Sequence, residues 1–372
     1  MNVPKLRFKE FNQDYKSGIL RDLIDYIADN RGKNPDYYLS QGIPVIDNFM
    51  IQNSRYPNLS LTNRFIDDNL YKNFIRKEIE PDDTLITLVG NGIGNLALVP
   101  NEKCVIIQNT LGLRTNLNND KKYLYYLLLS KNNEIKKLDR GMAQPSIRQD
   151  ELLSLDIFIP DKKEQLKVSN FLSRLDKKIE LQSKKIENLK LFKKGLISKL
   201  LNGYDYENMK IKNVLDFEQP TKYIVDSDEY INDDKAIPVL TANKAFILGY
   251  CNENNYYDKG DSIIFDDFTM DMKYTNFNYK VKSSAIKILT AKENHDLKFL
   301  YELLLSLNLT SEEHKRHYIS IVQEMNVKIP SIEIQKNISS KLNLIDNKIL
   351  LEEKFFNNLI KLKKGLMHNM FV

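Results

Sequence analysis

The chain has 372 residues, 42% of them hydrophobic, which predicts two or three domains with buried cores. Its two cysteines, Cys104 and Cys251, stand far apart, which fits a reduced, cytoplasmic protein and argues against a cysteine metal site. The net charge of +5 is modest, no apolar run reaches membrane length, and the charged N-terminus does not resemble a signal peptide, so we expect no membrane association.

The first region, residues 1–158, has the pattern of a mixed α/β domain. A helical pattern covers 121–138. Short β-type runs bounded by Gly, Pro, Asn and Asp predict strands at 43–46, 84–89, 96–99 and 104–107.

Several stretches could carry catalysis, but none is complete. "VGNGIGN" at 89–95 suggests a phosphate loop, yet a strand pattern and not a helix follows it, so a β-hairpin or tight loop is favoured. "NPDYY" at 34–38 nearly matches the NPPY loop of adenine methyltransferases, but no cofactor-binding strand–turn–helix fits before it. "HKRH" at 314–317 lacks further metal ligands, and the acid pairs at 82–83 and 266–267 are expected to be solvated turns.

A long charged segment at 159–203 has apolar residues spaced by four and three positions, the seam of a coiled coil. A second mixed α/β region follows at 204–328, with a predicted helix at 297–307, and the segment 329–372 repeats the seam. The alternative, two amphipathic helices packed on separate cores, stays open. The expected pairing residues are Leu172, Leu175, Ile179, Gln182, Ile186 and Leu189 in the first segment and Leu342, Ile345, Ile349, Glu352, Phe356 and Leu359 in the second.

The ending of the first long segment is written again at the end of the chain. The tetrapeptide KKGL at 193–196 returns 170 positions later at 363–366, and "KYLYYLLLS" at 122–130 returns as "KFLYELLLS" at 298–306. Two homologous halves are therefore predicted. Each repeated glycine falls within a helical pattern, where Gly costs about 1 kcal/mol relative to Ala, so we expect a close helix crossing or a kink there.

This order of variable region, long helix, second variable region and degenerate second helix resembles the specificity subunit of Type I restriction-modification systems. The most specific pieces are the start "VPKLRF" at 3–8 and "GMAQPSIRQDELLSLDIFIPDKKEQLKVSNFLSRLDKKI" at 141–179. Two features depart from the family pattern: the chain has no Trp near its start, and Ile334 replaces the Glu of the "EQ" pair in the second helix.

The resemblance implies a non-catalytic subunit with two mixed α/β target-recognition domains separated by two antiparallel helices. Each domain would read one half of a bipartite, asymmetric target in double-stranded DNA. Two methyltransferase subunits that bind S-adenosylmethionine would methylate adenine, and restriction subunits that use ATP and Mg²⁺ would join them for cleavage. No cofactor is expected on this chain itself.

The DNA-contacting residues are predicted from residue type and position. Arg and Gln bind base edges through paired hydrogen bonds, and Lys and Arg bind phosphates. Aligning "SI" at 146–147 with "YI" at 318–319 transfers one group of candidates to the second half. The candidates are Arg140, Gln144 and Arg148, their counterparts Lys315, Arg316 and His317, and two further sets, Arg31 with Lys33 and Lys273 with Tyr274.

Two other classes of protein stay open at this point. One is an enzyme, a methyltransferase or nuclease fused to a specificity module, which would need catalytic motifs that we do not find in the sequence. The other is an interaction scaffold built on the paired helices without DNA specificity of its own.

Overall fold

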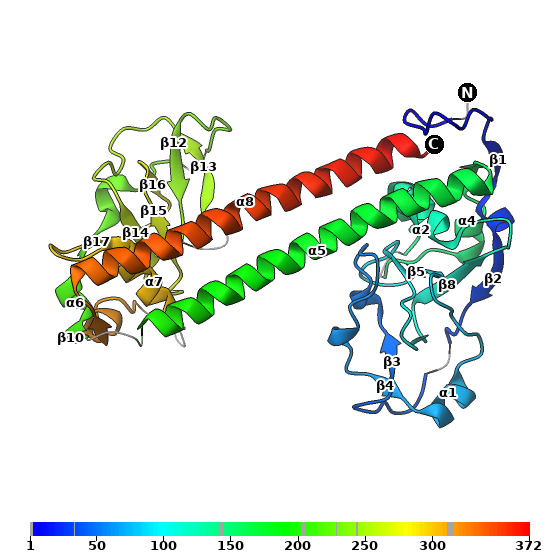
Figure 1. Ribbon diagram of the computed structural model, residues 1–372, viewed down its shortest axis with the longest axis horizontal. Helices are drawn as coiled ribbons and strands as arrows, with labels where there is room; N and C mark the ends of the chain where they lie inside the picture. Colours follow the sequence, from blue (N-terminus) through cyan, green and yellow to red (C-terminus); the bar gives the residue numbers. More distant parts are fainter. Residues whose placement is uncertain are drawn as a thin grey trace. The chain divides into compact units, whose positions relative to one another are not determined.

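The computed structural model describes residues 3–32, 34–141, 144–201, 206–227, 229–242, 245–310 and 316–372. The fold is mixed α/β, as predicted, and divides into two compact units (Figure 1). Unit 1 comprises Met1–Ser183 and Lys354–Val372, and unit 2 comprises Lys184–Glu353. The boundary between the units therefore falls within both long helices.

Unit 1 contains an antiparallel four-stranded sheet in the order β2-β8-β5-β6, a three-stranded sheet in the order β4-β3-β7, and the pair β1-β9. The bounds are β1 (Lys16–Ile19), β2 (Ile24–Ala28), β3 (Ile43–Ile46), β4 (Phe65–Ile66), β5 (Thr84–Thr87), β6 (Leu96–Leu98), β7 (Val105–Ile106), β8 (Thr110–Thr115) and β9 (Asp156–Ile159). Its helices are η1 (Leu20–Leu23), η2 (Asn48–Met50), η3 (Leu59–Leu61), α1 (Asp68–Phe74), α2 (Lys121–Ser130), α3 (Asn132–Lys136), α4 (Gln149–Leu153) and the first part of α5 (Lys162–Leu201).

Unit 2 repeats this topology strand for strand, with sheets in the orders β11-β17-β14-β15 and β13-β12-β16 and the pair β10-β18. The bounds are β10 (Glu207–Lys210), β11 (Leu215–Glu218), β12 (Ile237–Leu240), β13 (Ile247–Cys251), β14 (Ser262–Asp266), β15 (Met272–Thr275), β16 (Lys280–Val281), β17 (Ile286–Ala291) and β18 (Asn326–Ile329). Its helices are α6 (Ile211–Val214), η4 (Pro220–Tyr223), α7 (Leu297–Ser306), η5 (Val322–Glu324) and the first part of α8 (Ile332–Met370). The identical strand orders confirm the duplication predicted from the repeated segments.

The main core of each unit lies between the four-stranded sheet and its helices. In unit 1, α2 contributes three fully buried tyrosines and leucines beside them, and the end of α8 adds Met367 and Met370 to the same core. In unit 2, Phe299 and Leu300 of α7 occupy the corresponding core, and Leu196 of α5 packs against it. Each long helix therefore ends against the core of the other half's domain, which explains why the same ending is written twice.

The predicted long segments 159–203 and 329–372 contain α5 and α8, and every predicted pairing residue is buried or half-buried. Within unit 2 the two helices run antiparallel, because Lys185 pairs with Glu352 while Lys193 pairs with Asp346. The predicted boundaries of the variable domains, 1–158 and 204–328, stay a prediction, since each compact unit also includes parts of both helices.

Three expectations about local structure are wrong. The helix predicted at 121–138 breaks at Lys131, whose backbone leaves the helical region (φ −92°, ψ 13°), into α2 and α3. Nothing lies within 4 Å of a Cβ placed on Gly195 or Gly365, so the expected close crossing is wrong, while the alternative of a kink in the continuous helices stays a prediction. The acid pairs are not simply solvated, because Asp83 and Asp267 are each only 1% exposed.

Candidate nucleic-acid interface

Two loops that the sequence leaves far apart meet at one end of the four-stranded sheet of unit 1. The turn at 88–95 joins β5 to β6, which confirms the predicted β-hairpin. The Gly90 N–H donates to the Pro145 carbonyl (2.9 Å), and the Ile147 N–H donates to the Leu88 carbonyl (2.9 Å). The segment "GMAQPSIR" is thereby tied to the glycine loop. We call residues 88–95 and 139–148, without 142 and 143, the first loop pair.

Glycines shape the hairpin turn and asparagines hold it. Gly90, Gly92 and Gly94 have φ of 87°, 95° and 75°, a region that side chains disfavour. Asparagine amides beside the turn donate to it: Asn48 to the Asn91 carbonyl (3.2 Å), Asn132 to the Gly94 carbonyl (2.5 Å) and Asn53 to Oδ1 of Asn95 (3.2 Å). Asn95, in the turn itself, donates outward to the Ile51 carbonyl (2.9 Å). The turn is thus fixed by neutral hydrogen bonds.

The second loop of the pair presents three of the predicted DNA-binding side chains. Asp139 accepts the N–H groups of Gly141 (2.9 Å) and Ser146 (2.8 Å), and these bonds lower the pKa of its carboxyl. Arg140 is 64% exposed and pairs with Glu151 at 3.0 Å. Gln144 and Arg148 are also exposed, which leaves these side chains accessible to a ligand. The roles of all three stay predictions.

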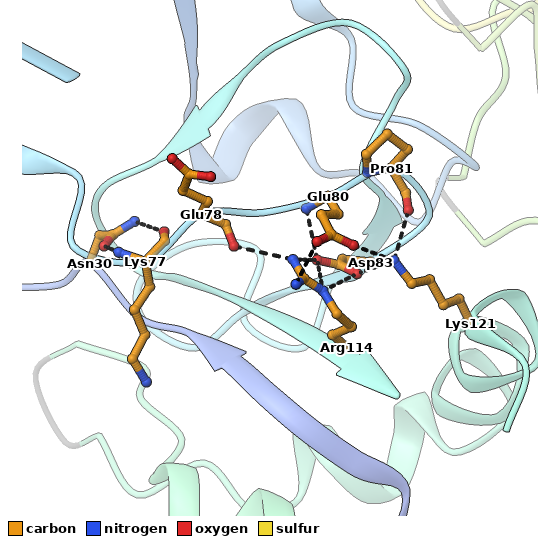
Figure 2. A network of polar contacts seen from close by, with 8 residues as sticks. All are labelled: Asn30, Lys77, Glu78, Glu80, Pro81, Asp83, Arg114 and Lys121. Atoms are coloured by element: carbon orange, nitrogen blue, oxygen red, sulfur yellow. Dashed lines mark hydrogen bonds and ion pairs between the residues drawn. The ribbon is translucent and has the colours of Figure 1, made fainter. Parts of the chain in front are cut away.

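Arg31, a candidate of the second set, is already engaged within the protein. Its guanidinium forms two hydrogen bonds to Asp29 (2.9 and 2.7 Å), which lower the pKa of the Asp29 carboxyl. The buried Asn30 beside it bonds the backbone of Lys77 in both directions (Figure 2). The Nε and Nη2 groups of Arg31 are therefore already engaged by Asp29. Lys33 lies outside the described residues.

The same network fixes the segment that leads into β5 (Figure 2). Asp83 forms ion pairs with Arg114 of β8 (2.8 Å) and Lys121 of α2 (2.9 Å) and accepts the Glu80 N–H (2.8 Å). These contacts join the sheet to the helix that covers it. These contacts explain why Asp83 is buried, and they indicate a structural role.

A second loop pair occupies the equivalent place in unit 2. It consists of residues 267–271, after β14, and residues 316–318. The His317 N–H donates to the Asp267 carbonyl (3.0 Å), as Ile147 does to Leu88 in unit 1. The match makes His317 the counterpart of Ile147, a shift of 170, so the predicted alignment of "SI" with "YI" is off by two residues.

The DNA-binding residues predicted in the second half differ in how far they are exposed. Arg316 is exposed, whereas the His317 side chain is only 3% exposed and so is not accessible in this structure. The DNA-binding roles of both stay predictions. Tyr274 hydrogen-bonds Asp261 and packs against Tyr301, with ring centroids 5.8 Å apart. Lys273 is half-buried on β15, and Lys315 lies outside the described residues.

Comparison with known proteins shows which family has this architecture. The family described as "Type I restriction modification DNA specificity domain" matches residues 12–191 and 204–361. This chain belongs to that family, the specificity subunits of Type I restriction-modification systems. The two matched segments correspond to the two halves recognised from the repeat.

Individual relatives agree with the family. The EcoR124I/EcoR124II specificity subunit of Escherichia coli is 40% identical over 141 residues, which are 36% of this chain and 35% of that subunit, so the match spans about a third of that protein. The MjaVIII specificity subunit of Methanocaldococcus jannaschii is 24% identical over 97% of this chain and 94% of its own. The S subunit from M. genitalium has the same fold, with a TM-score of 0.69 at 17% identity over 100% of this chain and 99% of its own.

The motif residues of this specificity-subunit family have structural roles here. Arg7, in "VPKLRF", forms two hydrogen bonds to Glu164 of the "EQ" pair (2.8 and 2.7 Å), and the Tyr15 hydroxyl donates to the same carboxylate. Gln165 bonds the Asp120 N–H and the Pro160 carbonyl, and Gln335 repeats both contacts in unit 2. The departure at Ile334 has a simple reason, because this side chain packs on the core of unit 2.

The repeated KKGL lysines form matched ion pairs that sequence reasoning missed. In unit 1, Lys363 lies 2.7 Å from Asp176, which also accepts the Tyr126 hydroxyl (2.7 Å). In unit 2, Lys193 lies 2.7 Å from Asp346 and 2.9 Å from Glu302. The shared shift of 170 between Asp176 and Asp346 is the signal that could have identified both pairs.

Other kinds of site are not found among the described residues. No group of three or more His, Cys, Asp or Glu side chains there could hold a metal ion. None of the described helices is both long and apolar enough to cross a membrane.

Proposed function

We propose that this chain is the DNA-reading subunit of a Type I complex and that each unit reads one half of a bipartite, asymmetric target. The observation that carries the proposal is that one topology presents two chemically different loop pairs. Unit 1 offers glycine, Gln144 and arginines, whereas unit 2 offers Arg316 above the buried Asp267. Different donors and acceptors select different base edges, so the two half-sites should differ in sequence.

The chain directs chemistry that partner subunits perform. Two methyltransferase subunits bring S-adenosylmethionine and methylate adenine, and restriction subunits bring ATP and Mg²⁺, all in the cytoplasm. The chain itself binds no cofactor and is not an enzyme.

Two copies of a methyltransferase need two equivalent docking surfaces, and the duplicated helices could supply them. Leu181 and Leu351 are 56% and 65% exposed, and Phe192 and Leu362 are 59% and 52% exposed. Both members of each pair stand 170 positions apart, at matching points of α5 and α8. Matched apolar residues on the exposed faces of both helices favour a partner that binds twice.

The test uses purified chain, labelled S-adenosylmethionine and double-stranded DNA, with and without the methyltransferase subunit of the same system. The chain alone should transfer no methyl groups, and the reconstituted complex should methylate DNA. Transfer by the chain alone would show a fused enzyme. A complex that forms but does not retain duplex DNA would favour the scaffold instead.

A further inference from the structure

Two neighbouring buried positions differ in chemistry between the two halves. In unit 1 these positions hold Leu88 on the hairpin turn and Leu111 on β8, and both are fully buried. In unit 2 the equivalent residues are Asp267 and Lys287, which are 1% and 0% exposed. A fully buried ion pair therefore stands where the other half has two leucines.

Backbone pairing establishes the equivalence. The Leu88 N–H donates to the Asn109 carbonyl, and the Asp267 N–H donates to the Ala285 carbonyl. On the neighbouring strands, Ile86 pairs with Leu111 and Phe265 pairs with Lys287. The same ladder positions are thus occupied by different side chains.

The polar pair has contacts that two leucines cannot make. The Oδ1 atom of Asp267 accepts the N–H groups of His317 (3.0 Å) and Tyr318 (2.7 Å), which fixes the backbone of the second loop pair. The Oδ2 atom lies 3.2 Å from Nζ of Lys287. Lys287 also donates to Oε1 of Gln219 at 2.9 Å. A polar chain thus runs from the loop through the core to Gln219.

A buried ion pair is weak evidence of a stabilising role. Burying two charges is costly, and replacing such a pair with apolar residues of similar size is often neutral or stabilising. Unit 1 shows that the topology accepts leucines at both positions. A role specific to the second half would explain why the charges of Asp267 and Lys287 are kept there.

Gln219, at the exposed end of this series of polar contacts, is suited to reading a base. Gln219 is exposed, and a lysine ammonium only donates hydrogen bonds, so the amide must turn its oxygen toward Lys287. Its NH₂ group is then left as a donor with a fixed direction. A free glutamine can pair with adenine as both donor and acceptor. In Gln219 the buried Lys287 holds one lone pair of the amide oxygen and turns that oxygen inward, which favours a contact through the NH₂ group, for example to guanine O6 or N7 or to thymine O4.

We propose that Gln219 reads an acceptor on a base of the second half-site, and that Asp267 and Lys287 are positioning residues that orient Gln219 and the 316–318 loop. The proposal rests on the proposed function, since it deepens the reading role of unit 2. Asp267 and Lys287 act through Gln219 and the loop and touch no base themselves.

The test replaces Asp267 and Lys287 of unit 2 with the leucines that unit 1 has at the equivalent positions. The variant D267L/K287L is co-expressed with the methyltransferase subunit of the same system, and methylated sites are mapped beside those of the wild type. The matched control is K280V: Lys280 is another buried lysine of unit 2, 2% exposed and paired with Glu253, and its counterpart in unit 1 is Val105. A second variant, Q219A, changes only an exposed side chain.

We expect D267L/K287L to fold, to keep the first half-site, and to lose about tenfold in preference at the second, the scale of one paired base contact. Q219A should relax one base position of the second half-site, and K280V should leave both half-sites unchanged. A D267L/K287L variant that folds and keeps wild-type sites and rates overturns the proposal. A Q219A variant with an unchanged second half-site also overturns it, and this result decides the matter whether or not the double variant folds. Absence of a bipartite site in the wild type would instead count against the proposed function.

Discussion

The glycines of the two KKGL tetrapeptides stand in unbroken helix with open space around them. Because a Cβ at Gly195 or Gly365 would meet nothing within 4 Å, alanine should fit without strain. We expect Gly195→Ala and Gly365→Ala each to stabilise the chain by about 1 kcal/mol, measured as the free energy of unfolding in denaturant. Gly112→Ala is the contrasting variant, since its Cβ would lie 2.7 Å from Ile79, and it should destabilise.

Asp139 is expected to matter for reading by the first unit, since its carboxylate ties the loop that carries Arg140 and Gln144. Asp139→Ala should weaken discrimination at the first half-site and leave the second unchanged, as seen by mapping methylated sites. Its lowered pKa means that this anchor is complete above the ordinary pKa of about 3.9 and is lost as the pH falls through the lowered value. Equal weakening at both half-sites would contradict the assignment.

At the scale of elements, ion pairs of the repeated lysines hold the ends of the long helices: Lys363 with Asp176 in unit 1, and Lys193 with Asp346 and Glu302 in unit 2. Removing the Lys363 ammonium leaves Asp176, which is only 7% exposed, with the Tyr126 hydroxyl as its remaining partner in the network described. We expect Lys363→Ala to lower the free energy of unfolding by about 1–3 kcal/mol. The neighbouring Lys361 is exposed, so Lys361→Ala should change it by less than about 0.5 kcal/mol. Equal effects would show that the ion pair does not fix the helix end.

Local patterns predicted the elements better than the contacts between them. The strand at 84–87, the hairpin turn and the helical seams follow from short-range periodicity and glycine spacing, which act within a few residues. The pairing of Asp267 with Lys287 and with the N–H of His317 joins positions 20 and 50 residues apart, and nothing in the local sequence marks it. Burial of His317 was missed for the same reason.

At the scale of the whole molecule, each half should read independently, because each unit has its own sheets and core. Replacing residues 10–150 with the corresponding region of another family member should change one half-site and leave the other intact. Mapping methylated sites checks this, and a change in both halves would show that the two readers are coupled.

The length of the long helices should set the gap between half-sites. Both α5 and α8 contribute to both units, so a change in length must be made in both, for example by seven residues after Leu181 and after Leu351. Seven residues keep the seam and add about 10 Å, which corresponds to about three base pairs. An insertion in α5 alone should prevent assembly, since the ion pairs of Lys193 and Lys363 fix the register at both ends. An unchanged gap in the double insertion would contradict this account.

Mapping of methylated adenine by single-molecule sequencing tests the central claim most directly. The host carries this chain together with the methyltransferase subunit of its system, and a second host carries the methyltransferase alone. The account predicts methylation in the first host only, within one bipartite sequence whose two halves differ and lie a fixed distance apart. A palindromic or continuous target, or identical methylation in both hosts, would contradict it.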